Sequence, residues 1–253
     1  MLAMIRDFAL LCVLTAGCSG KPDPGPPEVA APPPAPRQLH AVLVAGDASL
    51  PVFDNAVTGV AAWLTGPAGV LPGDITRLSA ARTVIAHGDA VPATGRQVLD
   101  AVGALPSGER TACFIFVTSH GIHGLGIALS RGNAVLTPVA LDAALSRGCA
   151  DTPTVVIVSG CYSGDFAAPP MARDNRIVLT AARADRPSFG CGAGRTYTVF
   201  DQCLLDSLPG GGTWRALFDR VRACVSAEED AEDFDPSEPQ GFFGAAVGDM
   251  AVP

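Results

Sequence analysis

Two apolar stretches that end in reactive side chains decide the fold. Residues 112–121 read ACFIFVTSHG, and residues 152–161 read TPTVVIVSGC. Each is a nearly continuous run of apolar residues, which is typical of a strand covered on both faces of a sheet. Similar runs occur at residues 39–45 and 176–182, and residues 74–80 are predicted as a further strand. Together these runs predict five strands of one mostly buried sheet.

Helical patterns separate the runs. They occupy residues 54–65, 94–105, 137–146, 199–208 and 213–226, with a hairpin pattern at 125–136 and a last strand at 240–247. Strands that alternate with helices predict an α/β fold, in which a mostly parallel β-sheet is flanked by helices on both faces. Ligands of such sheets bind beyond the carboxyl ends of the strands, so we expect the functional site there.

The composition is that of a folded domain with an acidic surface. Of the 253 residues, 48% are hydrophobic and 17% are charged, which supplies enough apolar material for a core. The formal net charge is −8. Because binding to nucleic acid phosphates needs a basic surface, this charge argues against nucleic acid as a partner.

The amino terminus predicts export. Residues 8–17 form an apolar run that is too short to span a membrane but suits the core of a signal peptide, which we place at residues 1–17. Its end, Leu-Thr-Ala-Gly before Cys18, resembles a bacterial lipobox, and the resemblance implies that Cys18 is lipidated. The protein would then be anchored by lipid to a membrane of the bacterial cell envelope. Plain secretion with cleavage near Ala16, or an uncleaved anchor, is the alternative.

A proline-rich segment follows at residues 18–38. It contains eight prolines and almost no residue that could join a core. Such composition favours extended conformations and is typical of a semi-stiff tether. We therefore expect one catalytic-type domain at residues 39–253.

Cys161 is the first candidate for catalysis, because a cysteine at the tip of a buried strand can present its sulfur to a substrate. The alternative is a small buried hydrophobic residue. The four histidines, His40, His87, His120 and His123, all precede Cys161. This order excludes papain-like and α/β-hydrolase arrangements, whose histidine follows the nucleophile. His120, at the end of another strand, is the partner placed to form a dyad with Cys161.

These motifs resemble the caspase/legumain clan of cysteine peptidases, in which one strand ends in His-Gly and a later strand ends in a small residue followed by Cys. More narrowly, the chain resembles the bacterial branch of the legumain-like peptidase C13 family. The supporting segments, in order, are VLVAGD at 42–47, TAARADR at 180–186, SFGC at 188–191 and PSEPQ at 236–240. The resemblance extends over residues 39–247.

The resemblance implies a caspase-like αβα sandwich and a cysteine endopeptidase that acts on proteins or peptides without a metal or cofactor. Cys161 would be the nucleophile and His120 the general acid/base. The backbone amides of Gly121 and Cys161 would bind the oxyanion. A peptide transamidase or ligase of the same family is one alternative, and a catalytically silent caspase-fold binding protein is another. A redox protein is disfavoured because Cys161 has no CxxC partner.

Four further residues are candidates for substrate binding: Asp54, Asn55, Tyr162 and Ser188. In the animal and plant relatives, an arginine that helps to hold substrate asparagine falls at the position of Asp54. An acidic residue there would favour Arg or Lys in the substrate, and Asn55 could supply an amide. Asp54 could instead be only a helix cap.

Two metal sites were also considered. His120 and His123 are three residues apart, but no further ligands complete a zinc site. The acidic run 228–235 lacks the regular spacing of a calcium loop, and a solvated loop is the expected structure.

The cysteines leave a limited choice of disulfides. Without Cys12 and Cys18, and with Cys161 as the nucleophile, five cysteines remain: Cys113, Cys149, Cys191, Cys203 and Cys224. In an oxidising envelope they could form at most two disulfides, with one thiol left over. The pairing cannot be deduced from the sequence. Simple burial is an alternative for Cys113, Cys203 and Cys224.

Overall fold

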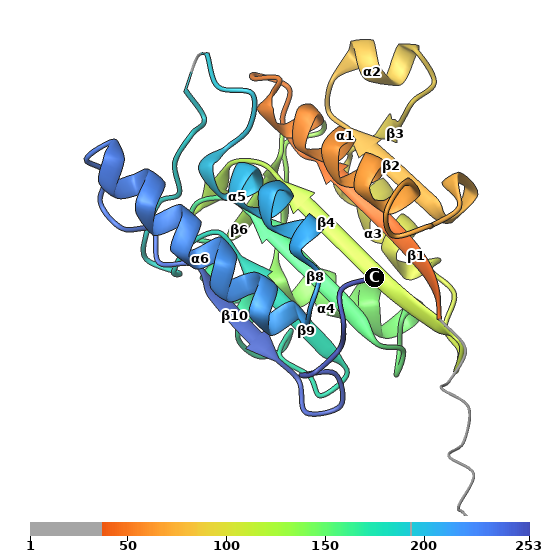
Figure 1. Ribbon diagram of the computed structural model, residues 1–253. Coiled ribbons are helices and arrows are strands. Elements are labelled where there is room, and N and C mark those ends of the chain that lie inside the picture. Colours follow the sequence, from red (N-terminus) through yellow and green to blue (C-terminus); the bar gives the residue numbers. More distant parts are fainter. Residues whose placement is uncertain (1–36, 193) are drawn as a thin grey trace, which may run out of the picture. The chain divides into compact units, whose positions relative to one another are not determined.

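The apolar runs assemble into a seven-stranded sheet of order β10-β9-β8-β4-β1-β2-β3 (Figure 1). The computed structural model describes residues 37–192 and 194–253. The strands are β1 (Gln38–Ala45), β2 (Ile75–Ser79), β3 (Val91–Pro92), β4 (Thr111–Thr118), β8 (Thr154–Ser159), β9 (Arg176–Thr180) and β10 (Gln240–Phe243). All neighbours are parallel except β10, which is antiparallel to β9. The predicted mostly parallel sheet is confirmed.

A second, antiparallel sheet lies between β4 and β8 in the sequence. It consists of β5 (Gly121–Ile122), β6 (Gly126–Leu129) and β7 (Ala134–Leu136). The pairing of β6 with β7 confirms the hairpin predicted at residues 125–136. β5 follows directly after His120, so this small sheet borders the carboxyl end of β4.

Helices cover both faces of the large sheet, as predicted (Figure 1). They are α1 (Val52–Thr65), α2 (Arg82–Ala86), α3 (Gly95–Gly103), α4 (Pro138–Gly148), α5 (Val199–Ser207) and α6 (Trp214–Ala231), with short 3-10 helices η1 (Pro72–Asp74), η2 (Ser163–Ala167) and η3 (Leu208–Gly210). Helices α1, α5 and α6 pack on one face, and α3 and α4 pack on the other.

The alternation of side chains along β4 explains why both faces need cover. Phe114 and Phe116 join the apolar cluster under α1, α5 and α6. Cys113, Ile115 and Val117 point the other way, into the cluster under α3 and α4. Because successive residues of a strand face opposite sides, a continuously apolar strand buries both of its faces.

Threonine caps fix where four of the helices begin. Thr94, Thr137, Thr198 and Thr213 precede α3, α4, α5 and α6, and each side chain accepts a hydrogen bond from a backbone amide of the first turn. Such caps satisfy amides that have no partner inside the helix, which contributes about 1 kcal/mol each. They place the start of α5 beside the ends of β4 and β8.

Two disulfides cross-link the domain. Cys113 of β4 pairs with Cys149 at the end of α4, and Cys203 of α5 pairs with Cys224 of α6. Cys161 and Cys191 are the free cysteines of the described residues. The limit of two disulfides and one spare thiol is therefore confirmed, whereas simple burial of Cys113, Cys203 and Cys224 is wrong.

The first and last strands have other boundaries than those predicted. Gln38, assigned to the tether, is the first residue of β1 and pairs with Thr111. β10 ends at Phe243 because its antiparallel partner, Ile177, is next to the first residue of β9. The last predicted strand is therefore shorter than residues 240–247.

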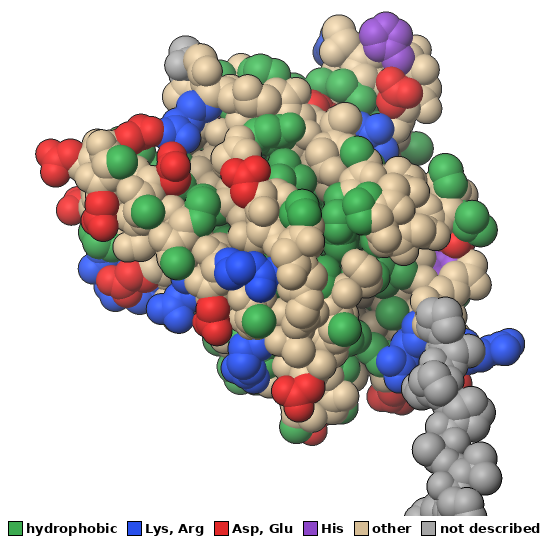
Figure 2. Space-filling model, in the orientation of Figure 1, with side chains coloured by type: hydrophobic (Ala, Val, Ile, Leu, Met, Phe, Trp, Pro, Cys, Tyr) green, Lys and Arg blue, Asp and Glu red, His purple; other side chains and the backbone are tan. Residues whose placement is uncertain are grey.

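The acidic run 228–235 is a solvated loop only in its second half, because α6 continues to Ala231 and residues 232–235 follow it outside any helix or strand. Glu229 is buried, and its carboxylate accepts hydrogen bonds from the backbone amide of Ser237 at 3.1 and 3.2 Å. The acidic side chains on either side of Glu229 are exposed, and Figure 2 shows acidic side chains gathered at the left, where α6 ends. A single inward carboxylate thus ties this end of the helix to the segment before β10.

The predicted signal peptide at 1–17, Cys18 and the tether up to residue 36 lie outside the described residues. Within the described part of the chain, no helix combines the length and the apolar character needed to cross a membrane.

Candidate active site

Three parallel strands bring the candidate side chains together at the carboxyl end of the sheet. In the pairing register, the last residue of β1, Ala45, lies opposite Thr118, and Thr118 lies opposite Ser159. The chain continues from these three positions to Asp47, His120 and Cys161. Parallel strands in register therefore place an acid, an imidazole and a thiol on adjacent strand ends.

His120 is held by contacts to the segment after β1. Its Nε2 lies 3.8 Å from Oδ1 of Asp47 and 3.5 Å from Oγ of Ser49. The ring packs edge-on against Phe53 of α1, with the centroids 5.2 Å apart. The His120 side chain is 44% exposed, so it is oriented by its neighbours and still open to solvent and substrate.

Asp47 is a site residue that the sequence analysis missed. Burial opposes its ionisation, but hydrogen bonds from the hydroxyl and amide of Ser49, a contribution from Ser130 and attraction to His120 outweigh burial and lower its pKa. The carboxylate is therefore an anion that can orient an imidazole and stabilise its protonated form. The sequence signal that could have identified Asp47 is its position just after β1, the strand that pairs with β4.

Backbone contact joins the two strand ends that carry His120 and Cys161. A Cβ atom on Gly121 would overlap the backbone carbonyl of Cys161, so only glycine fits at this position. A Cβ atom on Gly160 would lie 2.7 Å from the carbonyl oxygen of Ser119. The Gly residues beside His120 and Cys161 therefore allow an approach that larger residues would prevent.

The thiol of Cys161 faces Ser188. The backbone amide of Ser188 lies 3.3 Å from Sγ, the carbonyl oxygen of Ser188 lies 3.4 Å away, and its hydroxyl lies 3.8 Å away. In the described part of the chain, no hydrogen bond joins Sγ to the imidazole of His120. Catalytic hydrogen bonds are often long before substrate binds, so this spacing is compatible with a dyad. Ser188 is the predicted binding residue in direct contact with the sulfur.

Tyr162 continues the site toward the small sheet. It has a left-handed backbone conformation with φ of 56°, and its amide donates to the carbonyl oxygen of Arg186 at 2.8 Å. Its ring meets the ring of His123 edge-on at 5.0 Å. His123 is thus an aromatic neighbour of the site.

Asp54 and Asn55 lie in the first turn of α1, where neither caps the helix. The capping alternative for Asp54 is wrong, because the helix begins at Val52 and Pro51 occupies the cap position without a side-chain hydrogen bond. Asp54 instead accepts a 2.6 Å hydrogen bond from the hydroxyl of Ser79, and burial raises its pKa. Asn55 donates to the carbonyl oxygen of Thr196 at 2.9 Å.

A family model for the peptidase C13 family matches residues 82–241. The chain belongs to this family. The matched region includes His120 and Cys161, strands β4, β8 and β9, and the start of β10. Together with the seven-stranded, mostly parallel sheet and its two helical layers, the match establishes the caspase-like sandwich of the legumain-like peptidases. A search of the curated proteins finds no match to the chain.

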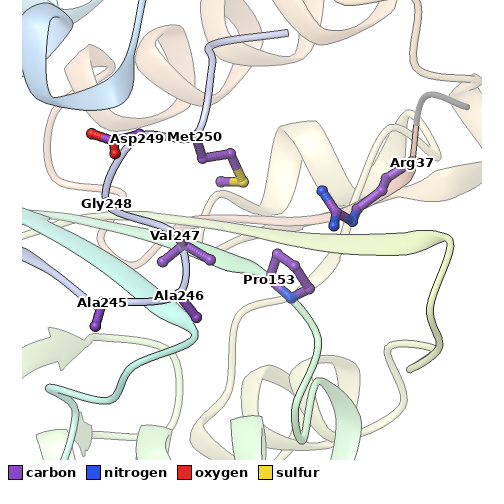
Figure 3. A pocket seen from close by; sticks show the side chains of 8 residues that line it. All are labelled: Arg37, Pro153, Ala245, Ala246, Val247, Gly248, Asp249 and Met250. Atoms are coloured by element: carbon purple, nitrogen blue, oxygen red, sulfur yellow. The ribbon is translucent and has the colours of Figure 1, made fainter. Parts of the chain in front are cut away.

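The hollow shown in Figure 3 is separate from the candidate active site. It is lined by Arg37, Pro153 and residues 245–250. Arg37 directly precedes β1 and Pro153 directly precedes β8, so the hollow lies at the amino ends of the parallel strands. The candidate residues lie at the opposite, carboxyl ends. Among residues 37–192 and 194–253, no cluster of three or more potential ligands is arranged to hold a metal ion.

Cys191 is the second free thiol, and it is expected to be unreactive. Burial, together with Cys161, Asp201 and Asp47, raises its pKa to about 11. Because the thiolate is the nucleophile, iodoacetamide at pH 7.5 should alkylate Cys161 and leave Cys191 untouched. Peptide mapping by mass spectrometry measures this directly. Cys191→Ser should keep the wild-type labelling of Cys161, whereas labelling of Cys191 in Cys161→Ala would contradict the assignment.

Asp201 is the most buried acid near the site, with no exposed surface. Burial raises its pKa to about 6, although the neighbouring hydroxyls of Thr118, Ser159 and Thr198 act to lower it. Its folded-state pKa is above the unfolded value of about 3.9, so its contribution to stability is complete below pH 4 and is lost as the pH rises through about 6.

Asp201→Asn removes this titration. From pH 4 to pH 8, the free energy of unfolding of wild type should fall by about 3 kcal/mol relative to that of Asp201→Asn, because two units of pKa correspond to about that energy. Urea unfolding of both proteins across this pH range measures the difference. Parallel pH dependences of the two proteins would show that Asp201 has an ordinary pKa.

Proposed function

We propose that the chain is a cysteine endopeptidase that hydrolyses peptide bonds through Cys161 and His120. The single observation that carries the proposal is the convergence of three strand ends. His120 lies within 3.8 Å of the anionic Asp47, and Cys161 lies on the backbone that touches Gly121, the residue after His120. Membership of the C13 family supports the same chemistry.

The reaction begins when Cys161 loses its proton to His120 and its sulfur attacks the peptide carbonyl carbon. A C–S bond forms, and the carbonyl oxygen becomes an oxyanion, whose binding we assign to the backbone amides of Gly121 and Cys161. Asp47 stabilises the imidazolium at this stage, because its charge lies on the Nε2 side of the ring.

The intermediate then collapses with cleavage of the C–N bond. His120 gives its proton to the departing amine, which leaves an acyl group on Cys161 as a thioester. Water enters, loses a proton to His120 and attacks the thioester carbonyl. The C–S bond breaks, His120 returns its proton to the sulfur of Cys161, and the product leaves as a carboxylic acid that ionises in solvent.

A transamidase of the same family would differ only in the last step, in which an amine replaces water. A silent binding protein would perform none of the steps. Incubation of a mixed peptide library with wild type and with Cys161→Ala, with and without hydroxylamine, separates the three. Free carboxyl products from wild type alone support the peptidase. Hydroxamates that dominate over acids support the transamidase, and uncut peptides in both samples support the binding protein.

The same products report on specificity. The carboxylate of Asp54 lies against Ser79 and is half-buried, while Asn55 is joined to the segment that follows Cys191. New carboxyl termini that end in Arg or Lys would support recognition of a basic residue by Asp54. Termini that end in asparagine would exclude it.

We further propose that the protein is anchored in the bacterial cell envelope through a lipid on Cys18. The proposal rests on residues 1–18 of the sequence, with an apolar run that ends in Leu-Thr-Ala-Gly-Cys. Mass spectrometry of the mature amino terminus tests it. A lipid-modified cysteine at the first position supports the anchor, and an unmodified residue there contradicts it.

A further inference from the structure

A buried carboxylate on α5 lies beneath the two strand ends that carry the dyad. Thr118 donates a hydrogen bond from Oγ1 to Oδ2 of Asp201 at 2.8 Å, and Asp201 has no exposed surface. The hydroxyl of Ser159 also acts on this carboxylate and lowers its pKa. Asp201 therefore touches neither solvent nor substrate and contacts the sheet from below.

The positions of its two partners in the sheet are equivalent. Thr118 ends β4 and Ser159 ends β8, and they lie opposite each other in the pairing register. Each stands two residues before a member of the dyad, His120 or Cys161. Their side chains point to the face that α5 covers, because Phe116 and Ile157, two residues earlier on each strand, belong to the cluster on that face.

Local structure also fixes the place of Asp201 itself. Its backbone amide donates to Oγ1 of Thr198 at 3.1 Å, which is the cap of α5. The helix start and the end of β4 are thus joined through one side chain and one cap. A shift of the β4 end would have to break the hydrogen bond of Thr118 or displace the first turn of α5.

Burial of the Asp201 carboxylate without a cationic partner lowers the stability of the folded protein. Oδ1 of Asp201 is buried without a hydrogen-bond partner, and no cationic side chain of the described residues forms an ion pair with the carboxylate. Other titratable groups at this end of the sheet include Asp47, Asp54, His120, Cys161, Tyr162 and Cys191. Buried acids that lack a cation are concentrated at functional sites.

We propose that Asp201 is a positioning residue that holds the end of β4 in place beside the end of β8 and so fixes where His120 lies relative to Cys161. The proposal rests on the proposed Cys161–His120 dyad. It assigns Asp201 no contact with substrate and no proton in the reaction.

The test is the rate of alkylation of Cys161 by iodoacetamide as a function of pH, measured on the whole protein. In wild type, His120 should keep Cys161 reactive at pH 6, and His120→Ala should lose this reactivity. Asp201→Ala should slow alkylation at pH 6 by about 10- to 100-fold, because small misplacements of catalytic groups have effects of this size. Asp201→Asn keeps an oxygen for Thr118 and should restore most of the rate.

A double variant separates positioning from a general structural role. If Asp201 acts through His120, Asp201→Ala combined with His120→Ala should be no slower than His120→Ala alone, whereas independent effects would multiply. Asp206→Ala on the same helix is the matched control, because Asp206 is exposed and bonded only to Gln202. It should react like wild type.

The outcomes distinguish this inference from the function on which it rests. If His120→Ala leaves the wild-type profile unchanged, the dyad itself is wrong. If the profile depends on His120 but Asp201→Ala leaves it unchanged, or if the two effects multiply, Asp201 is not a positioning residue. If Asp201→Ala fails to fold, Thr118→Val takes its place, because valine has nearly the shape of threonine but lacks the hydroxyl donor. Thr118→Val should then slow alkylation at pH 6 by about the same factor. Combined with His120→Ala, it should be no slower than His120→Ala alone.

Discussion

Cys161→Ala is expected to lower the rate of peptide-bond cleavage by at least about 10³-fold, because alanine cannot form the acyl-enzyme. His120→Ala should lower it by about 10²- to 10⁴-fold at neutral pH, since both the base and the acid of the mechanism are lost. Part of that loss should be recovered toward pH 8.5, where an unassisted thiol ionises. Initial rates on a peptide that wild type cuts, measured from pH 6 to pH 9, test both variants.

The matched controls are Cys191→Ser and His87→Ala. Cys191 is half-buried with a pKa raised to about 11, and His87 is exposed at the end of α2. Both variants should cleave at the wild-type rate. Activity that survives in Cys161→Ala, or that is lost equally in His87→Ala and His120→Ala, would contradict the dyad.

Asp142→Ala is expected to have the largest effect on stability, with a loss of about 3–5 kcal/mol in the free energy of unfolding. Asp142 of α4 binds Arg176 at 2.7 Å and Arg173 at 2.7 Å. The side chain of Arg176 is only 1% exposed, and burial lowers its pKa while Asp142 opposes that effect. Because a guanidinium stays charged in proteins, the variant would bury an unpaired cation at the start of β9.

Urea unfolding followed by circular dichroism measures this loss. Asp142→Asn keeps hydrogen-bond acceptance but not the charge, so its loss should be smaller than that of Asp142→Ala. Asp100→Ala is the control, because the pair of Arg96 and Asp100 is 90% and 66% exposed and such pairs contribute under about 1 kcal/mol. A loss for Asp142→Ala as small as that for Asp100→Ala would contradict the importance of the buried pair.

The central strands of the sheet were predictable from the pattern of hydrophobic residues. The continuous apolar runs of β1, β4, β8 and β9 identified the centre of the sheet, because strands buried on both faces leave no other reading of such runs. The end of α6 was not predictable. The inward turn of Glu229 depends on the amide of Ser237, which only the folded chain brings near.

The site residues also fall into two groups, those that the sequence predicted and those that it did not. Cys161 and His120 could be found because glycines follow or precede them at the tips of apolar strands. Asp47 and Asp201 were missed because their roles depend on contacts across the sheet and across the α5–sheet interface. The disulfide partners, 36 and 21 residues apart, likewise follow from packing rather than from spacing.

The most direct test of the central claim is detection of the acyl-enzyme on Cys161. Wild type is mixed with a peptide that it cuts, quenched in acid within the first turnovers, digested and examined by mass spectrometry. We predict that the peptide containing Cys161 carries the amino-terminal product as a thioester, and that Cys161→Ala carries no adduct. Cleavage at an undiminished rate with no acyl group on Cys161, or with the acyl group on another residue, would contradict the mechanism.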